Sequence, residues 1–301
     1  MTDSQSHTNE ISAVKLWVMG ARPRTLPAAV VPVLVGAALA VGSAHPVWWR
    51  IGLALVVSLS LQVGVNYAND YSDGVKGTDA VRVGPVRLVG SGLVAPKLVK
   101  RAALMSFGCA AVCGLVLSMA TTPWLLLVGV CAIAAGWTYT GGPRPYGYLG
   151  LGEIFVFIFF GVVATLGSAY AVAEELTSAM WISCVPVGCF ACALLVVNNL
   201  RDIPTDSKVG KNTLAVRLGD TRTRQFFLFL FVLSAVFVIA VAVQKPAAIL
   251  GLVGIASARS AVRTVRGGAT GRDLIAVLGA TGRAQLIFGL VFSIGLLIAN
   301  R

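Results

Sequence analysis

Two polar segments interrupt an otherwise apolar chain, and both combine asparagine with aspartate at matching intervals. They are NYANDYSD, with Asn66, Asp70 and Asp73, and NNLRDIPTD, with Asn198, Asp202 and Asp206. Residues four apart lie one turn apart on the same face of a helix, so each segment predicts one oxygen-rich surface. Carboxylates gathered there repel each other unless a cation neutralises them, and oxygen ligands favour Mg2+ or Mn2+ over zinc. These two acidic boxes therefore predict a site for a divalent metal and a diphosphate.

The composition places these boxes in a membrane protein. The 301 residues are 57% hydrophobic and 12% charged, which excludes a soluble globular domain. Because a helical crossing takes about 20 residues, we predict an all-α, polytopic bundle of about nine transmembrane helices. The predicted spans are 26–43, 51–69, 102–120, 124–138, 152–173, 181–200, 225–243, 246–262 and 284–300.

The basic residues indicate how the bundle is oriented. Lys and Arg concentrate in cytoplasmic loops. With a cytoplasmic N-terminus, all of the 24 Lys and Arg residues except Arg50, Lys245 and Arg301 fall inside. Both acidic boxes then face the cytoplasm at the cell membrane. Orientation and attraction to anionic headgroups account for the net charge of +12, so nucleic acid is not expected as a partner.

The chain is predicted to hold one domain and a short tail. Residues 1–14 predict a flexible polar tail, because they lack the basic start and apolar core of a cleaved signal peptide. Residues 15–301 predict a single transmembrane domain. The six cysteines fall within predicted spans without a neighbouring histidine, so we interpret them as packing residues.

Glycine, lysine and threonine follow each box, in VKGTD after the first and VGKNT after the second. Backbone amides freed by glycine, together with lysine, suit phosphate oxygens. The candidate diphosphate-binding residues are Lys76, Arg87, Lys208 and Lys211. The glycine- and proline-containing segment 80–99 is too broken to span, and we predict that it folds over the membrane face and closes the site.

Four further residues are candidates for holding an anionic aromatic partner. Arg22 and Arg24 open the first span, where they either anchor it by charge or clamp an anion. Tyr139 and Arg144 lie in a glycine-rich loop, for which a structural turn and an aromatic-acid site are both open. An ion-coupled transporter is the rival from another class, but its carboxylates would lie near the bilayer midplane. Here the carboxylates lie at helix ends and are followed by glycine and lysine.

The boxes resemble those of the UbiA superfamily of membrane prenyltransferases, which carry an Asn-x3-Asp box after the second helix and an Asp-x3-Asp box after the sixth. The similarity covers nearly the whole chain. Five segments are similar, more narrowly, to bacterial 1,4-dihydroxy-2-naphthoate prenyltransferases of menaquinone synthesis: ARPRTLPAAVVPV, NDYSDGVKGTD, RLVGSG, YTGGPRPYGYLGLGE and NNLRDIPTDSKVGKNTLAVRLG. In the wider superfamily the first box usually reads Asp-x3-Asp. Here Asp70 and Asp73 are three apart, so either Asp73 or Asp79 completes the first metal set.

The resemblance implies a UbiA-type bundle with its active site on the cytoplasmic side. The implied reaction transfers a polyprenyl group from its diphosphate to the naphthoate ring, releasing diphosphate and CO2 to give demethylmenaquinone. Mg2+ would stabilise the departing diphosphate, held by the aspartates of both boxes with Asn66 and Asn198 completing its coordination. Arg22, Arg24 or Arg144 would hold the carboxylate of the acceptor. A UbiA-type enzyme with another acceptor, such as 4-hydroxybenzoate, is the nearest alternative.

Overall fold

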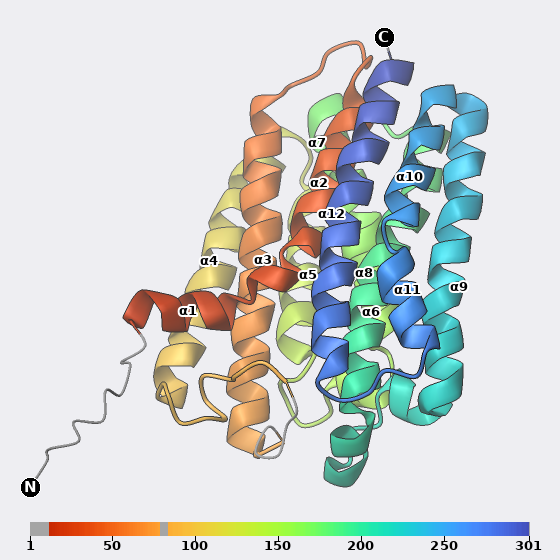
Figure 1. Ribbon diagram of the computed structural model, residues 1–301. Helices are drawn as coiled ribbons and strands as arrows, with labels where there is room; N and C mark the ends of the chain where they lie inside the picture. Colours follow the sequence, from red (N-terminus) through yellow and green to blue (C-terminus); the bar gives the residue numbers. More distant parts are fainter. Residues whose placement is uncertain (1–11, 79–83, 301) are drawn as a thin grey trace, which may run out of the picture.

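Long apolar stretches form the helices of a bundle in the computed structural model, which describes residues 12–78 and 84–300 (Figure 1). The α-helices are α1 (Ala13–Ala21), α2 (Pro27–Ala40), α3 (Trp49–Lys76), α4 (Pro96–Ala120), α5 (Trp124–Thr138), α6 (Gly152–Val156), α7 (Ala164–Ala173), α8 (Ser178–Asp206), α9 (Leu214–Gln244), α10 (Gly251–Ala256), α11 (Arg259–Arg266) and α12 (Asp273–Ala299). Shorter 3-10 or π segments are η1 (Pro23–Thr25), η2 (Tyr146–Leu149), η3 (Phe157–Val163), η4 (Ser207–Val209) and η5 (Pro246–Leu250). Those ranges contain no strand, so the all-α prediction is confirmed.

The helices confirm a multi-pass membrane protein without confirming the number of crossings. Within the described chain, 6 helices are long and apolar enough to span a bilayer: α3, α4, the continuous α6–η3–α7 segment, α8, α9 and α12. Two further pairs qualify together, but α2 is bent by 54° from α1–η1, and α11 by 45° from η5–α10. Helix α5 is apolar but shorter. Every predicted span therefore coincides with helix, whereas the count of nine stays a prediction.

Proline and an unusual backbone conformation explain the first bend. Arg22 ends α1 with φ +54°, in the left-handed region that L-residues rarely adopt, and Pro23 and Pro27 start the next two segments. Proline is favoured at the first turn of a helix and disrupts its interior, so the chain must restart at these positions. As a result α1 lies across the bundle, while α2 runs along it (Figure 1).

Helix α8 forms the centre of the bundle and is the most buried of the spans. It packs against α9, α12 and η3. Stacked and edge-on phenyl rings join three of these helices, with Phe190 of α8 between Phe231 of α9 and Phe288 of α12. Glycine permits a close approach of η3 to α8, because a Cβ on Gly161 would lie 2.7 Å from the Cα of Gly188. This packing fixes α8 against the segment that carries several aromatic side chains.

The two acidic boxes lie in the last turns of the helices α3 and α8, rather than in the loops after them. Helix α3 continues to Lys76, where Gly77 terminates it with φ +72°. Helix α8 continues to Asp206 before η4 begins. Both helices end on the same side of the bundle, so the boxes are brought to one end of the molecule (Figure 1).

Candidate active site

A cavity of about 690 Å3 extends from the boxes into the bundle. Its polar end is lined by side chains from both boxes and the segment after α8, namely Asn66, Asn69, Asp73, Asn198, Asp202 and Lys211. Its other end is lined by small and apolar residues of α4, α5 and α7, including Gly114, Gly129 and Gly167. The cavity therefore joins an acidic and basic mouth to an apolar interior.

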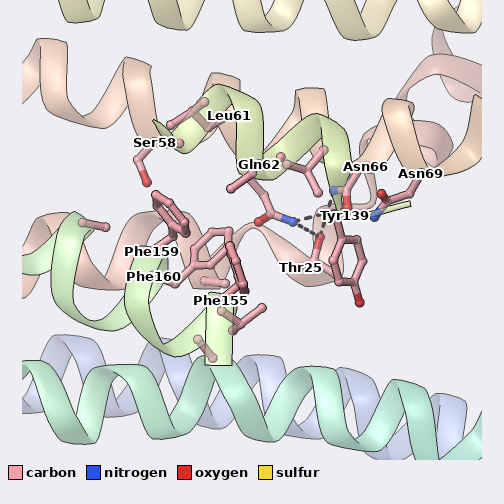
Figure 2. A pocket seen from close by; sticks show the side chains of 18 of the residues that line it. Thr25, Ser58, Leu61, Gln62, Asn66, Asn69, Tyr139, Phe155, Phe159 and Phe160 are labelled. Carbon is pink, nitrogen blue, oxygen red and sulfur yellow. Dashed lines mark hydrogen bonds between the residues drawn. The ribbon is translucent and has the colours of Figure 1, made fainter. Parts of the chain in front are cut away.

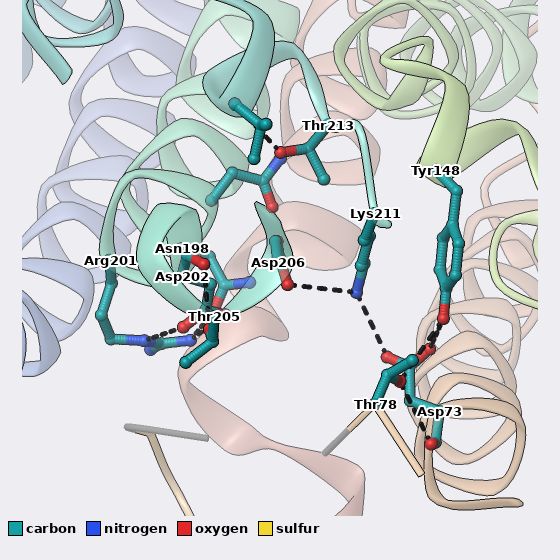
Figure 3. Close-up of polar contacts among 12 residues, drawn as sticks. Asp73, Thr78, Tyr148, Asn198, Arg201, Asp202, Thr205, Asp206, Lys211 and Thr213 are labelled. Carbon is teal, nitrogen blue, oxygen red and sulfur yellow. Dashed lines mark hydrogen bonds and ion pairs between the residues drawn. The ribbon is translucent and has the colours of Figure 1, made fainter. Parts of the chain in front are cut away.

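Asp73 is the carboxylate of the first box that faces the cavity. It is 2% exposed, and its Oδ1 accepts a 2.8 Å hydrogen bond from the Tyr148 hydroxyl. Its Oδ2 lies 3.4 Å from the Nζ of Lys211 (Figure 3). One turn earlier, Asn69 also lines the cavity, and its Oδ1 accepts a 2.8 Å hydrogen bond from the hydroxyl of Thr140.

The structure gives Asp70 a different role from the predicted metal ligand. Its two carboxylate oxygens accept hydrogen bonds of 2.9 Å from the backbone amides of Leu88 and Val89. Asp70 is 1% exposed and does not line the cavity. Because a buried carboxylate is stabilised by such amides, Asp70 fastens the loop before α4 to the end of α3. The prediction that segment 80–99 folds over this face is supported by residues 84–95 of that loop.

Asn66 lines the cavity, but its side-chain atoms form hydrogen bonds with other groups of the protein. Its Nδ2 donates to Ala21 O at 2.8 Å and to Thr25 Oγ1 at 3.0 Å, and its Oδ1 accepts from Gln62 Nε2 at 3.3 Å. The cavity-facing pair is therefore Asn69 with Asp73. This pair keeps the Asn-x3-Asp spacing of the second box but is shifted by three positions from the predicted one.

The second box contains its own counter-ion. Arg201, 3% exposed, donates to both oxygens of Asp202 at 2.7 Å through Nε and Nη2, and Nη2 also donates to Asn198 Oδ1 at 2.8 Å. Such a two-point pairing satisfies both carboxylate oxygens and holds their orientation. The sequence pointed to Arg201 only as one of the cytoplasmic basic residues.

Lys211 joins the two boxes. Its Nζ lies 3.4 Å from Asp73 Oδ2 and 4.0 Å from Asp206 Oδ1, so one cation stands between carboxylates of α3 and α8 (Figure 3). Asp206 is 8% exposed and lies just outside the cavity lining. Among the described residues, no three carboxylate, cysteine or histidine side chains form a ready-made metal cage. The oxygen donors nevertheless fit a hard cation, and the ammonium group of Lys211 occupies a position between them.

Tyr148 is a site residue that the sequence analysis missed. Its hydroxyl donates to Asp73, while Nζ of Lys76 and Nζ of Lys211 lie 5.1 and 5.0 Å from its ring centroid. Cations at this distance are attracted to the face of an aromatic ring. Tyr148 therefore helps to fix the positions of the Asp73 carboxylate and the Lys211 ammonium group relative to each other. The glycines around it indicated an ordered loop but not which tyrosine points inward.

The remaining predicted residues divide between the cavity and the surface. Lys76 donates to the carbonyls of Thr140 and Gly142 at 2.7 and 3.2 Å, so it ties α3 to the loop after α5. The residues that line the cavity are Arg22, Arg24, Arg87 and Tyr139. Lys208 and Arg144 are exposed and do not line the cavity, although they were predicted to bind the diphosphate and the aromatic acid. Asp79, the alternative ligand of the first box, lies outside the described residues.

Tyr139 lines the cavity with an uncharged aromatic side chain. Burial raises the pKa of Tyr139 well above its ordinary value, and the nearby Glu153 raises it further. Burial likewise raises the pKa of Tyr146, whose ring stacks on Phe155 with centroids 4.0 Å apart. Both phenols therefore remain protonated at neutral pH and provide an uncharged aromatic wall beside the acidic mouth.

The fold and the site define an integral membrane protein whose acidic and basic mouth opens into an apolar cavity, which suits a substrate with a charged head and an apolar tail. The chain belongs to the UbiA prenyltransferase family, whose model matches residues 29–273. A 1,4-dihydroxy-2-naphthoate octaprenyltransferase of Mycobacterium tuberculosis is 50% identical over 274 residues, covering 91% of this chain and 94% of that protein. The Escherichia coli protein of the same name is 39% identical over 241 residues, covering 75% of this chain and 76% of that protein.

Solved structures share the fold at much lower sequence identity. A UbiA homolog from Archaeoglobus fulgidus bound to GPP and Mg2+ aligns with a TM-score of 0.68 at 14% identity, covering 94% of this chain and 99% of that chain. The apo structure of a UbiA homolog from Aeropyrum pernix K1 aligns with a TM-score of 0.64 at 16% identity, covering 91% and 96%. The predicted UbiA-type bundle is therefore confirmed.

Proposed function

We propose that this protein transfers a polyprenyl group from polyprenyl diphosphate to 1,4-dihydroxy-2-naphthoate, with release of diphosphate and CO2 and formation of demethylmenaquinol, the reduced form of demethylmenaquinone. The observation that carries the proposal is the placement of Lys211 between the acidic boxes at the mouth of an apolar cavity. A diphosphate needs cations at the mouth, and a polyprenyl tail needs an apolar space behind it. The relatives named for this reaction, at 39 and 50% identity, support the naphthoate as acceptor.

We infer that the diphosphate is held with Mg2+, or with Mn2+ in its place. The proposed ligands share oxygen donors that lie in or beside the cavity mouth: Asn69, Asp73, Asn198, Asp202 and Asp206. When bound, the ion supplies Lewis-acid stabilisation of the negative charge that forms on the leaving diphosphate. The protein's own cations that line the cavity, Lys211 and Arg87, are available to neutralise the phosphate oxygens, while Arg201 pairs with Asp202. Asp70 is left out of this set because it does not line the cavity and backbone amides bond to both of its oxygens. Asn66 is left out because its amide joins Ala21, Thr25 and Gln62.

The cavity also supplies what an allylic cation requires after diphosphate leaves. Beside the mouth its walls carry the aromatic rings of Tyr139 and Tyr146, with Phe155 stacked on Tyr146. Aromatic faces attract cations, and an apolar enclosure keeps water from reacting with them. Arg22 and Arg24 line the same cavity and are the residues placed to hold the acceptor carboxylate.

We propose that the protein resides in the cytoplasmic membrane with its N-terminus and active site on the cytoplasmic side. The exposed basic residues support this orientation, because they gather around the ends of the helices that carry the boxes. They include Lys97, Lys100, Arg101, Lys208, Arg222, Arg263 and Arg266. Basic side chains at the cytoplasmic face are favoured by the insertion rule and by anionic lipids.

The function is tested by incubating the purified protein with Mg2+, a radiolabelled polyprenyl diphosphate and one acceptor. We expect a lipid-soluble product with 1,4-dihydroxy-2-naphthoate and none with 4-hydroxybenzoate. A product with the benzoate alone would replace the acceptor assignment. The absence of any product, in protein that remains folded, would contradict the proposed reaction.

Replacing Tyr148 with phenylalanine removes only the hydroxyl that orients Asp73. We expect the Mg2+ concentration for half-maximal activity to rise about tenfold, since residues that orient metal ligands contribute about 10- to 100-fold to metal affinity. The KM for the naphthoate should stay unchanged. Tyr170→Phe on α7 is the matched control and should behave as the wild type. An unchanged Mg2+ requirement in Tyr148→Phe would contradict the orienting role.

A further inference from the structure

Halfway along α3, the amide of Gln62 faces the cavity from a buried position. The residue is 7% exposed and lines the cavity. Its Nε2 donates to Thr25 Oγ1 at 3.0 Å and to Asn66 Oδ1 at 3.3 Å. The described residues supply no hydrogen bond to its Oε1, which points into the cavity on the side away from Thr25 and Asn66 (Figure 2).

The direction of this amide is fixed by backbone carbonyl groups. Ala21 O can only accept, so the group of Asn66 that lies 2.8 Å from it is the Nδ2 donor, which leaves Asn66 Oδ1 as an acceptor. The Thr25 hydroxyl donates to Arg22 O at 3.0 Å, so its oxygen accepts from its other neighbours. Both partners of Gln62 are therefore acceptors, and its amide nitrogen must face them.

The consequence is a hydrogen-bond acceptor of fixed direction that faces the cavity. Ser58, one turn earlier on α3, also lines the cavity but donates its hydroxyl to Ala29 O at 2.8 Å. A carbonyl oxygen that the protein leaves without a donor is unfavourable unless water or a ligand reaches it, since the net penalty of leaving such a group unpaired is about 1–3 kcal/mol. Water or a substrate donor must therefore satisfy Gln62 Oε1. The bonds to Thr25 and Asn66 prevent the amide from turning to offer its nitrogen instead.

Aromatic rings face this oxygen across the cavity. Figure 2 shows Phe155, Phe159 and Phe160 opposite Gln62. Phe155 and Phe159 are close to parallel, with centroids 6.2 Å apart and planes inclined by 25°. The π-helical turns of η3 carry Phe159 and Phe160, and such irregular turns often place side chains at functional sites. An acceptor oxygen opposite parallel rings is suited to a flat aromatic molecule that carries a hydroxyl group.

We propose that Gln62 is a specificity-determining residue that accepts a hydrogen bond from a ring hydroxyl of the aromatic acceptor, while the phenylalanine wall contacts the face of its ring. The inference rests on the proposed function and adds a defined contact to it. Gln62 lies 11 residues from Asp73 on one helix, which is about 16 Å along the axis. This offset leaves room for the diphosphate and the reacting carbon at the mouth, with the acceptor ring deeper in the cavity.

The test uses Gln62→Met, which keeps an unbranched side chain of similar length and removes the acceptor oxygen. Inhibition constants are measured for 1-hydroxy-2-naphthoate, 4-hydroxy-2-naphthoate and 2-naphthoate, which differ only in the hydroxyl group. We expect the constant for at least one hydroxylated compound to rise about 5- to 10-fold, the effect of one lost hydrogen bond. The constant for 2-naphthoate should change by less than about twofold. The KM for the prenyl diphosphate should remain that of the wild type.

Gln285→Met is the matched control, because Gln285 is a fully buried glutamine of α12 that does not line the cavity. It should leave all three constants unchanged. An equal rise for 2-naphthoate and the hydroxylated compounds in Gln62→Met would assign Gln62 a structural role and overturn the inference. No change in any constant would overturn it as well. If the wild-type protein transfers no prenyl group to the dihydroxynaphthoate, the proposed function itself fails, which the same assay reveals before any variant is compared.

Discussion

Replacing Asp73 with asparagine is expected to lower kcat/KM for prenyl transfer by about 10²- to 10³-fold, the usual effect of removing one preorganised group that stabilises transition-state charge. The substitution keeps the size of the side chain but removes the negative charge that faces Lys211 at 3.4 Å. It also removes a charged oxygen donor from the proposed metal site. The measurement is initial-rate transfer from labelled polyprenyl diphosphate, together with size-exclusion chromatography in detergent to establish folding.

Asp220→Asn is the matched control for this charge removal. Asp220 forms an ion pair with Arg224 one turn away on α9, its side chain is 55% exposed, and it does not line the cavity. Because exposed ion pairs of this kind contribute at most about 1 kcal/mol, activity and folding should both be retained. Wild-type activity in folded Asp73→Asn protein would refute the role assigned to the first box.

Lys211→Ala is expected to raise the KM for polyprenyl diphosphate by about 10- to 100-fold, since a hydrogen bond to a charged group contributes about 1.5–3 kcal/mol. The KM for the naphthoate should change by less than about threefold on the same scale. The physical reason is the position of Nζ between Asp73 and Asp206, where it can reach phosphate oxygens but lies at the polar end of the cavity. Steady-state kinetics with each substrate varied in turn separates the two effects.

Lys208→Ala provides the comparison for Lys211, because the two lysines lie in the same connection but Lys208 is exposed and does not line the cavity. It should leave both KM values near those of the wild type. Equal increases for the two substrates in Lys211→Ala would argue against a phosphate contact. A larger effect of Lys208→Ala than of Lys211→Ala would reverse the assignment made from the structure.

Hydropathy was sufficient to predict the helices but not their bends or ends. Every predicted span coincides with helix because about 20 apolar residues have few alternatives in a bilayer. The start of the chain differs most, since the predicted first span, 26–43, corresponds to α2 alone, and the helix α1 that lies across the bundle before Arg22 and Pro23 was not predicted. The helices α3 and α8 also continue through both boxes, whereas the predicted spans ended before the boxes did.

The register of the first box shows why a matching interval is not enough to place side chains. NYANDYSD contains Asn-x3-Asp twice, as Asn66 with Asp70 and as Asn69 with Asp73. Only tertiary contacts distinguish them, because the backbone amides of Leu88 and Val89 donate hydrogen bonds to Asp70 while Asp73 faces the cavity. The repeated interval itself was visible in the sequence, and both registers could have been considered.

Charge alone was also a poor guide to which basic residues reach the site. Lys208 and Arg144 were predicted to bind substrate but are exposed. Arg201 was used only to predict the membrane orientation, and it pairs directly with Asp202. Tyr148 and Gln62 form hydrogen bonds with Asp73 and Thr25, which are distant from them in the sequence. Such contacts depend on how helices pack against one another, which hydropathy and spacing do not specify.

The pairing of the boxes with different cations has a consequence for the biosynthesis of the protein. Asp202 obtains its counter-ion from the adjacent Arg201, so the end of α8 is neutralised as soon as that helix forms. The ion-pair partner of Asp73, Lys211, is translated 138 residues later. During synthesis, Lys76 and Tyr148 are therefore available to Asp73 before Lys211 is. We expect the two halves to complete their docking only after the segment following α8 leaves the ribosome, with Lys211 as the residue that joins them.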